Sequence, residues 1–540
     1  MSIIFNYLRQ LDSPTLERLA GQTIVRAVGS AFNTNKESEL ARLVTERYGS
    51  EIFSVPEIRS CILEGLQRSD AEKYCRLLAV PFKDSDLPQA NLVSYFSGPF
   101  TVDKSRQLVE ILGVSEDFVR KIIVDDRKAT ELLEFPINSS GRLRGYLHPF
   151  QRRIKDQIVL SIEQMVPRVM VQMPTGAGKT VTALETVVDI FRLPLKKKFV
   201  VWLVNSNELA EQALETFRSL WLQKGDRPIA IHRLFGSFNP DFLQYNEGFV
   251  VASFGTLQGP IHDATHTNHS KVWRLIKKTD LLIVDEAHTS VADTYEQIIR
   301  TFLSSSDTRL IGLSATPARN TTTETSELAN LYSGQLISIT DEDEQPVTDV
   351  VGYLQSMGYL AKLITKVLES GASSSDQEEK RICKSLAEHS DRNSLIIKQI
   401  EIAVEHGEPT LVFSCTKDHV FALIALCRAK GIHADFIVGE TPPSERNKKL
   451  DAFRKGMLNI LINYDILSTG VDLPNVRRLI LTRPIGSPIL FSQMLGRALR
   501  GPKNGGCDTN TVITIRDNLL NYTNENMIYQ HFANEFSYAP

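Results

Sequence analysis

The sequence predicts an α/β protein in which two consecutive parallel-sheet domains follow a mostly α-helical region. From about residue 142 onward, short β-branched runs alternate with helical segments, and this alternation occurs twice. Strands that alternate with helices are typical of parallel sheets, because each connection crosses back over the sheet. The predicted strands are 169–173, 199–204, 248–253, 281–284 and 309–313 in the first series, and 410–414, 434–438, 459–463, 478–481 and 511–515 in the second.

The region before this alternation is predicted to be helical, since apolar residues recur three and four positions apart, as in Leu16, Leu19 and Ala20. It contains no catalytic motif and slightly more acidic than basic residues. This fits a module for a protein partner or, equally, a spacer packed on the other domains. We predict a helical accessory domain at 1–140, sheet domains at 141–335 and 381–540, and a polar linker with a flexible loop at 336–380.

Composition restricts the function of the chain. The 540 residues carry a net charge of -3, so any contact with nucleic acid must come from a local groove and not from overall attraction. The six cysteines are scattered without a C-x-x-C pair, which is typical of reduced thiols in the cytosol. No apolar run reaches about 18 residues and the N-terminus lacks a signal-peptide pattern, so we expect a cytoplasmic protein without a membrane span.

A glycine turn follows the first predicted strand and leads into a helix. Its residues are Thr175, Gly176, Ala177, Gly178, Lys179 and Thr180. In a phosphate-binding turn the backbone N–H groups surround phosphate oxygens, the lysine reaches the outer phosphates and the final hydroxyl contacts Mg²⁺. The pattern departs from the general form at Met173, where a glycine is usual, so an ordinary strand-turn-helix corner is the alternative.

Two carboxylates follow the strand predicted at 281–284. The carboxyl end of a parallel strand lies at the same sheet edge as the glycine turn, which brings Asp285 and Glu286 near the phosphates. Asp285 is predicted to hold Mg²⁺ through its water shell, and Glu286 to orient and deprotonate the water that attacks the γ-phosphate. A strand that ends in a polar turn is the alternative, and Lys179 and Thr180 upstream weaken it greatly.

Four segments resemble, in order, the motifs of superfamily 2 helicases and translocases: 176–180, 285–288, 314–316 and 493–500. The second segment reads Asp-Glu-Ala-His, a DEAH-type motif, and the set is closer to the restriction and repair branch than to RNA helicases. The resemblance covers roughly residues 142–517 and leaves the helical region unassigned. It implies two RecA-like domains with ATP bound in the cleft between them.

The resemblance implies roles for single residues of the nucleotide site. Gln151 would read adenine, because its amide offers both a donor and an acceptor. Gly470 and Asp472 would face the nucleotide. The residues that would couple hydrolysis to motion are His288, Ser314 and Thr316.

Three later residues would take part in catalysis, namely Gln493, Arg497 and Arg500. Arg497 would sense the γ-phosphate and Arg500 would act as the arginine finger. Their spacing of four and then three residues predicts that all three lie on one helix face aimed across the cleft. Contacts with nucleic acid, each with a purely structural role as the alternative, are expected from Asn205, Ser253, Thr256, Ser414 and Thr441.

These features together predict a helicase or translocase that uses ATP and Mg²⁺ and acts on DNA in preference to RNA. An RNA-dependent remodelling ATPase is one alternative, and a nucleotide-gated binding or signalling clamp that unwinds nothing is another. No nuclease motif is evident, so cleavage would belong to a separate nuclease, which residues 1–140 would be suited to bind. DNA repair or antiviral defence is the expected setting.

Overall fold

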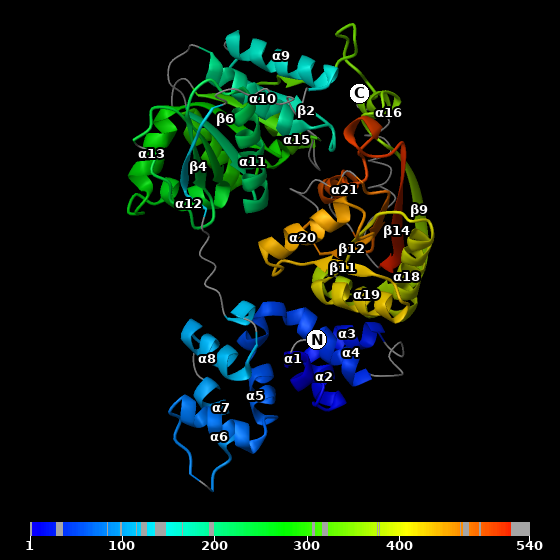
Figure 1. The fold of residues 1–540 in the computed structure, drawn as a ribbon. Helices are drawn as coiled ribbons and strands as arrows, with labels where there is room; N and C mark the ends of the chain where they lie inside the picture. Colours follow the sequence, from blue (N-terminus) through cyan, green and yellow to red (C-terminus); the bar gives the residue numbers. More distant parts are fainter. Residues whose placement is uncertain are drawn as a thin grey trace.

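The computed structural model contains a helical module followed by two parallel-sheet domains, which confirms the predicted fold class (Figure 1). It describes residues 3–519 except 29–35, 84, 98–99, 115, 120–126, 136–146, 165, 194–198, 243, 305–307, 316–321, 375, 377, 465, 468–472, 474 and 485–487. Among the helices described, none has the length and apolar character needed to cross a membrane.

The first sheet has the strand order β1-β4-β5-β3-β6-β7-β2-β8 and is parallel except at β1, which pairs antiparallel with β4. Its central strands are continuous apolar runs because helices cover both faces of the sheet; every residue of β3 is buried. All five predicted strands are present, and β1, β4 and β8 were missed. The strands are β1 (Thr130–Leu133), β2 (Arg168–Gln172), β3 (Phe199–Val204), β4 (Ile229–Leu234), β5 (Gly248–Ser253), β6 (Thr279–Asp285), β7 (Arg309–Ser314) and β8 (Leu336–Ile337).

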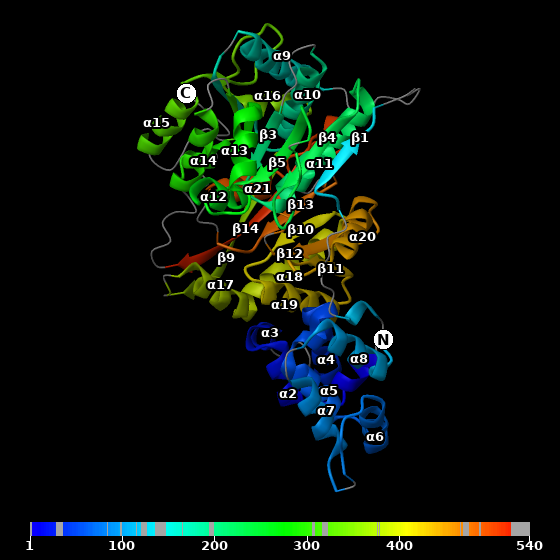
Figure 2. The same ribbon diagram turned by 90° about the vertical axis from the view of Figure 1, so that its left-hand side faces the viewer.

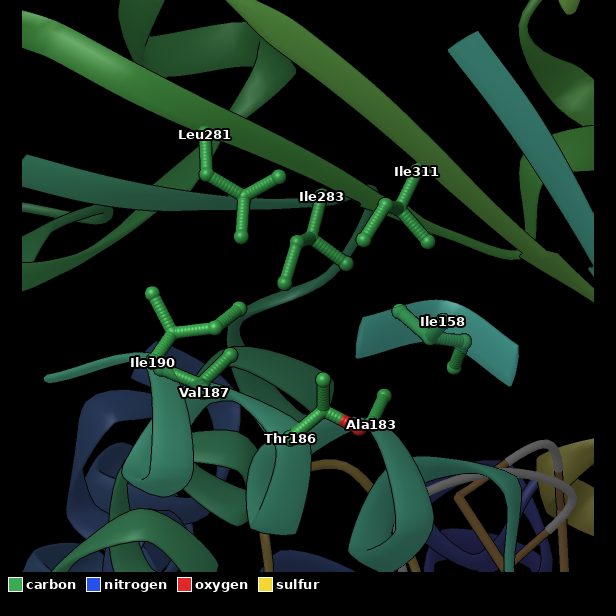
Figure 3. Close-up of a pocket in the computed structure, with 8 residues that line it drawn as sticks. All are labelled: Ile158, Ala183, Thr186, Val187, Ile190, Leu281, Ile283 and Ile311. Atoms are coloured by element: carbon green, nitrogen blue, oxygen red, sulfur yellow. The ribbon is translucent and has the colours of Figure 1, made fainter. Parts of the chain in front are cut away.

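Two sets of helices cover this sheet. One face carries α9 (Pro149–Glu163), α10 (Lys179–Arg192) and α11 (Asn207–Lys224), and the other carries α12 (Phe254–His262), α13 (His269–Lys278), α14 (Asp293–Leu303) and α15 (Thr322–Leu331). Val187 and Ile190 of α10 face Ile283 and Ile311 of the sheet, with Ile158 of α9 beside them (Figure 3). These side chains leave no space for a water molecule, so the helix that follows the glycine turn is packed tightly on the sheet.

The second sheet is wholly parallel in the order β11-β12-β10-β13-β14-β9. Its strands are β9 (Lys362–Ser374), β10 (Thr410–Phe413), β11 (Ala434–Ile437), β12 (Ile460–Asn463), β13 (Arg478–Leu481) and β14 (Thr509–Leu519). Side chains alternate between the two faces of the sheet along β10. Val412 is therefore buried in the core under one face, and Leu411 and Phe413 in the core under the other. One face carries α17 (Glu379–Glu388), α18 (Ser390–Glu405) and α19 (Lys417–Ala429), and the other α20 (Pro443–Arg454) and α21 (Pro488–Leu495).

Most of the predicted linker at 336–380 belongs to ordered elements instead. β8 pairs with β2 of the first sheet, and β9 pairs with β14 and contains the beginning of the predicted flexible loop. Between them α16 (Val350–Ser356) places Val351 and Leu354 in the core of the first sheet domain. The polar composition was misleading because β9 is an edge strand with mostly exposed side chains. The domain boundaries themselves stay a prediction.

The N-terminal module has its own apolar core, which draws on most of its helices. They are α1 (Ile3–Leu8), α2 (Ser13–Ala20), α3 (Gln22–Val28), α4 (Lys36–Tyr48), α5 (Pro56–Glu64), α6 (Arg68–Leu77), α7 (Pro88–Ser97) and α8 (Val102–Leu112), with the 3-10 helices η2 (Gly49–Ser54) and η3 (Glu116–Phe118). Cap residues mark both ends of the helices. Asp12 caps the start of α2, and Gly113, in the left-handed conformation, follows the end of α8.

The module also packs on the second sheet domain, where α3 and α4 lie against α19 (Figure 1 and Figure 2). Ile24 and Leu43 of the module are buried in one core with Phe421 of α19. The ion pairs around this contact are Arg26–Glu388 (2.9 Å), Arg47–Asp418 (3.0 Å), Arg428–Glu39 (3.3 Å) and Arg428–Glu46 (2.6 Å). Further along the chain β1 joins the first sheet, so the N-terminal region contacts both sheet domains.

Candidate nucleotide site

The glycine turn connects the end of β2 to the first residue of α10. Gly176 and Gly178 have φ angles of 85° and 83°, a left-handed conformation in which other residues are strained. A Cβ atom on Gly178 would also collide with the side-chain amide of Gln151. The turn therefore needs glycine at both positions, and its backbone leads directly into the N-terminus of a 14-residue helix.

Gln151 holds this turn against the start of α9. Its Nε2 donates a hydrogen bond to the carbonyl oxygen of Ala177 (2.7 Å), and its Oε1 accepts one from the backbone N–H of His148 (2.9 Å). The side chain is 6% exposed. The amide predicted to read adenine thus has protein partners for both its oxygen and its nitrogen, and the adenine role stays a prediction.

Lys179 forms ion pairs with the two predicted acids. Its Nζ donates to Glu286 Oε1 at 2.9 Å and lies 3.5 Å from Asp285 Oδ1. Burial lowers the pKa of Lys179, but the negative charges of Glu286 and Asp285 outweigh burial and raise it overall. Burial also raises the pKa of Asp285, more than the charge of Lys179 lowers it. The lysine is therefore a permanent cation next to the glycine turn.

Glu286 has a strained backbone and a carboxyl group whose pKa is lowered. Its φ of 51° is left-handed, a strained conformation that is uncommon outside glycine and clusters at functional sites. Burial raises its pKa, but Lys179, His288 and Arg497 together hold the pKa below its ordinary value. Arg497 belongs to the second sheet domain, so the charge of that domain reaches the carboxylate across the cleft.

His288 and Ser314 lie behind the two acids. His288 Nδ1 is 3.5 Å from Glu286 Oε2 and 3.3 Å from Ser314 Oγ. The carbonyl oxygen of Ser314 accepts a hydrogen bond from the backbone N–H of Met173 at 3.0 Å, immediately before the glycine turn. Both residues are thus connected to the turn, while Thr316, Gly470 and Asp472 lie outside the described residues.

The prediction that Gln493, Arg497 and Arg500 lie on one helix face is wrong. Helix α21 ends at Leu495, the next turn is tightened by a hydrogen bond from Arg497 N–H to the Met494 carbonyl (3.1 Å), and Arg500 pairs with Leu360 in an isolated β-bridge. Glycine disfavours helix, and pairing with Leu360 requires an extended backbone. Gly496, between the first two residues, was the sequence signal for this break.

The second sheet domain touches the glycine turn at this break. A Cβ atom on Gly496 would collide with the side chain of Thr175, and one on Gly176 would lie 3.5 Å from both Leu360 and Leu499. Sequence analysis missed these contacts because they join residues that are far apart in the chain. They bring the segment that carries Arg497 and Arg500 next to the predicted phosphate site.

The side chains present fit a magnesium nucleotide. The turn combines a helix N-terminus with the cationic Lys179, which suits phosphate oxygens. Asp285 is 4% exposed and has the hard oxygen ligand that Mg²⁺ prefers, and Thr180 lies in the first turn of α10, directly after Lys179. Asp285 and Thr180 would therefore hold the ion, and Lys179 the phosphates.

The five residues predicted to contact nucleic acid have different environments. Asn205 is exposed at the end of β3. Ser253 caps α12, accepting from Thr256 N–H (3.3 Å), and the two hydroxyls are 2.9 Å apart. Ser414 is 1% exposed, and Thr441 Oγ1 accepts from Val438 N–H at 3.0 Å. Ser253, Ser414 and Thr441 are thus buried in this structure. A surface groove of about 600 Å³ lies between α12 and α14, and its lining includes Gly255 and Gln258, which flank Thr256 in the sequence.

Comparison with known proteins gives two family matches. A family described as type III restriction enzyme, res subunit, matches residues 145–319, and one described as helicase conserved C-terminal domain matches residues 391–502. The Dbp5 structure of Saccharomyces cerevisiae bound to RNA and ADP BeF3 has a TM-score of 0.46 and 18% identity, covering 73% of this chain and 93% of that one.

Two curated relatives match over a longer stretch. IRC3 of Saccharomyces cerevisiae, named as an ATP-dependent helicase, is 28% identical over 66% of this chain and 49% of its own length. The EcoKI endonuclease subunit, a type I restriction enzyme of Escherichia coli, is 24% identical over 74% of this chain and 36% of its own length. The chain thus spans about half or less of these two relatives. Together with the motif order and the two parallel sheets, these matches support a superfamily 2 helicase of the restriction-like branch.

Proposed function

We propose that this chain hydrolyses ATP between its two RecA-like domains and uses the energy to move along or unwind nucleic acid, with DNA as the preferred substrate. The observation that carries the proposal is the convergence of Lys179, Asp285 and Glu286 at one sheet edge, with Arg497 of the other domain acting on the same carboxylate. A largely buried base, a phosphate-binding cation and a charge supplied by a second domain are the parts of phosphoryl transfer.

Each residue has a defined task in this proposal. Lys179 exchanges its ion pair with Glu286 for the phosphates, which frees the Glu286 carboxylate to accept a proton from the attacking water. Asp285 and Thr180 would hold Mg²⁺, which would supply positive charge beside the phosphates. Arg500 acts as the arginine finger, so that hydrolysis depends on the approach of the second domain.

DNA is the proposed substrate because the matched family is named for a restriction enzyme, and restriction enzymes act on DNA. The EcoKI relative is named as an endonuclease subunit, and the matched region covers 36% of it. We therefore include a separate nuclease as a partner in the proposal. The groove between α12 and α14, lined in part by Gly255 and Gln258, is the proposed place of contact with the strand.

The helical module, with boundaries near 1–140, is proposed to bind this partner through the part that does not pack on α19. Purification of the full chain with a tag, compared with a chain that carries charge-reversing substitutions on α6, tests this role. Exposed Arg68 and Arg76 on α6 are suitable positions. A co-purifying protein that is unaffected by these substitutions would argue against α6 as the binding surface.

The test of the whole proposal is the rate of ATP hydrolysis with single-stranded DNA, duplex DNA or RNA, on wild type and on Glu286→Gln. We expect stimulation by DNA, and a loss of about 100-fold or more in Glu286→Gln because the general base is removed. Stimulation by RNA alone would favour a remodelling ATPase. Hydrolysis that no nucleic acid stimulates would contradict the motor and favour a nucleotide-gated clamp.

A further inference from the structure

The segment that connects the two RecA-like domains makes side-chain contacts with both. The ring of Tyr359, just after α16, lies 4.5 Å from the ring of His148 and 4.9 Å from that of Phe150, measured between centroids. His148 and Phe150 are at the start of α9, next to Gln151. Tyr359 is 5% exposed and belongs to the core of the first domain. The connecting segment is therefore anchored on the helix that holds the glycine turn.

The same segment binds the backbone on both sides of Arg500. Ala361 N–H donates to the Leu499 carbonyl (2.9 Å), and Gly501 N–H donates to the Tyr359 carbonyl (3.1 Å). Leu360 and Arg500 face each other in the β-bridge between these two hydrogen bonds. The connecting segment therefore helps to fix the position of the Arg500 main chain, in addition to the contacts within the second domain.

Asn504 closes the arrangement from the second domain. It ends the 3-10 helix η5 (Pro502–Asn504), and its Nδ2 donates to the Tyr359 carbonyl at 2.8 Å. Its Oδ1 is 2.7 Å from His148 Nε2, so the histidine nitrogen is the donor. One amide therefore joins the connecting segment and α9 to the residues that follow Arg500.

We propose that His148, Tyr359 and Asn504 form a positioning node that sets Arg500 relative to the nucleotide. The inference rests on the proposed role of Arg500 as the arginine finger. The backbone N–H of His148 also donates to Gln151 Oε1, and the Gln151 amide holds the glycine turn. A nucleotide that moves Gln151 or the turn therefore acts on His148, and through Asn504 and Tyr359 on the backbone of Arg500. None of the three residues needs to touch the reacting atoms.

The node predicts a specific change in kinetics. Asn504→Ala removes both amide contacts while leaving Lys179, Asp285 and Glu286 in place. We expect kcat for ATP hydrolysis to fall about 10-fold, since small misplacement of a catalytic group has large effects, and KM for ATP to change less than about twofold. His148→Ala should have a similar effect. The double variant should be no slower than the slower single variant, because both substitutions break the same hydrogen bond.

The chain offers a closely matched control in Asn393. Its Nδ2 donates to the Ala387 carbonyl (2.9 Å) and its Oδ1 accepts from His419 Nε2 (2.9 Å), the same pair of contacts as in Asn504 but within the second domain. Asn393→Ala should lower stability while kcat stays close to wild type. If Asn393→Ala and Asn504→Ala lower kcat equally, or if the double variant shows additive losses, the node is wrong.

A further variant separates this inference from the proposed function. Arg500→Ala should abolish most hydrolysis if Arg500 is the finger. Full hydrolysis by Arg500→Ala would contradict the finger role itself. A strong loss in Arg500→Ala with wild-type kcat in Asn504→Ala would leave the proposed function intact and overturn only the node.

Discussion

Single glycine residues set how closely the two RecA-like domains approach. Gly496 has no side chain, and Thr175 of the glycine turn occupies the space where one would be. The contact is between domains, so a larger residue disturbs the cleft and not the core of either domain. The effect of a substitution should therefore appear in hydrolysis before it appears in stability.

We predict that Gly496→Ala lowers the rate of ATP hydrolysis by about 10-fold or more, because the added methyl group displaces the glycine turn from the segment that carries Arg497. Thermal unfolding should change little. Adding Thr175→Ser removes the colliding methyl group and should recover part of the rate. If Gly496→Ala hydrolyses ATP like wild type, the close approach is not needed for turnover.

At this scale, the sequence was sufficient to identify residues near the carboxyl ends of strands. Lys179, Asp285 and Glu286 meet because parallel strands end at one edge, and this edge follows from local pattern. The bridge between Leu360 and Arg500 was not predictable, since it joins segments separated by a whole sheet domain. The helix expected through Arg500 ignored Gly496 and this tertiary pairing.

At the scale of elements, a buried ion pair holds helix α18 to the end of strand β14. Arg392 Nε donates to Asp517 Oδ1 at 2.8 Å and its Nη2 to Oδ2 at 3.0 Å, with neither side chain exposed. Ser370 of β9 also donates to Asp517. Removing one partner leaves the other charge buried without compensation.

We predict that Asp517→Ala lowers the free energy of unfolding by about 3–5 kcal/mol, measured by urea denaturation. The neighbouring pair of Arg516 in β14 and Glu369 in β9 is 38% and 64% exposed. Glu369→Ala should therefore change the free energy of unfolding by no more than about 1 kcal/mol. Equal effects of the two substitutions would contradict the importance of burial.

Helix α19 contains a histidine that makes stability depend on pH. Burial and, to a smaller extent, the charge of Arg392 lower the pKa of His419 to about 3. Its Nδ1 accepts from Cys415 N–H and its Nε2 donates to Asn393, so the neutral form is required. Below about pH 6.5 the unfolded chain binds a proton that the folded chain does not, and stability falls as pH decreases toward 3.

We predict that this site lowers the free energy of unfolding by about 2 kcal/mol between pH 7 and pH 5. His419→Gln, which keeps a donor and an acceptor, should reduce the pH dependence by that amount. Urea midpoints of both proteins at the two pH values provide the measurement. Identical pH dependence in the variant would show that His419 is not the group responsible.

Sequence alone also had limits at the level of elements. Buried strands such as β3 and β10 were predicted almost to the residue, because a strand covered on both faces is apolar throughout. The edge strands β1, β8 and β9 were missed, since one side of each faces solvent and only the pairing partner reveals them. Strand β4 was missed although it is buried, because His232 and Arg233 interrupt its apolar run. These edge strands are the ones that carry the connections between domains.

At the scale of the whole molecule, the helical module and the second sheet domain share a core. Ile24 of α3 is fully buried among residues of α18 and α19, so the two parts should lose structure together. The shared core was not visible in sequence, because the amphipathic pattern of α3 indicates a buried face without indicating its partner.

We predict that Ile24→Ala increases hydrogen exchange in α19 as well as in α3, with a loss of about 2–5 kcal/mol from the cavity. Leu108→Ala in α8 is the matched control, because Leu108 is buried in the separate core of the module. It should increase exchange in the module and leave α19 protected. Protection of α19 in both variants would contradict a shared core.

The antiparallel strand β1 limits how far the two lobes can separate. The module is fixed to one lobe and β1 to the other, and only the stretch from Phe118 to Thr130 connects them. A chain spans at most about 3.6 Å per residue, so Phe118 and Thr130 cannot lie more than roughly 40 Å apart. The two lobes are therefore joined twice along the chain, once through the module and β1 and once through the segment from β8 to β9, and the two connections together limit their separation more than one would.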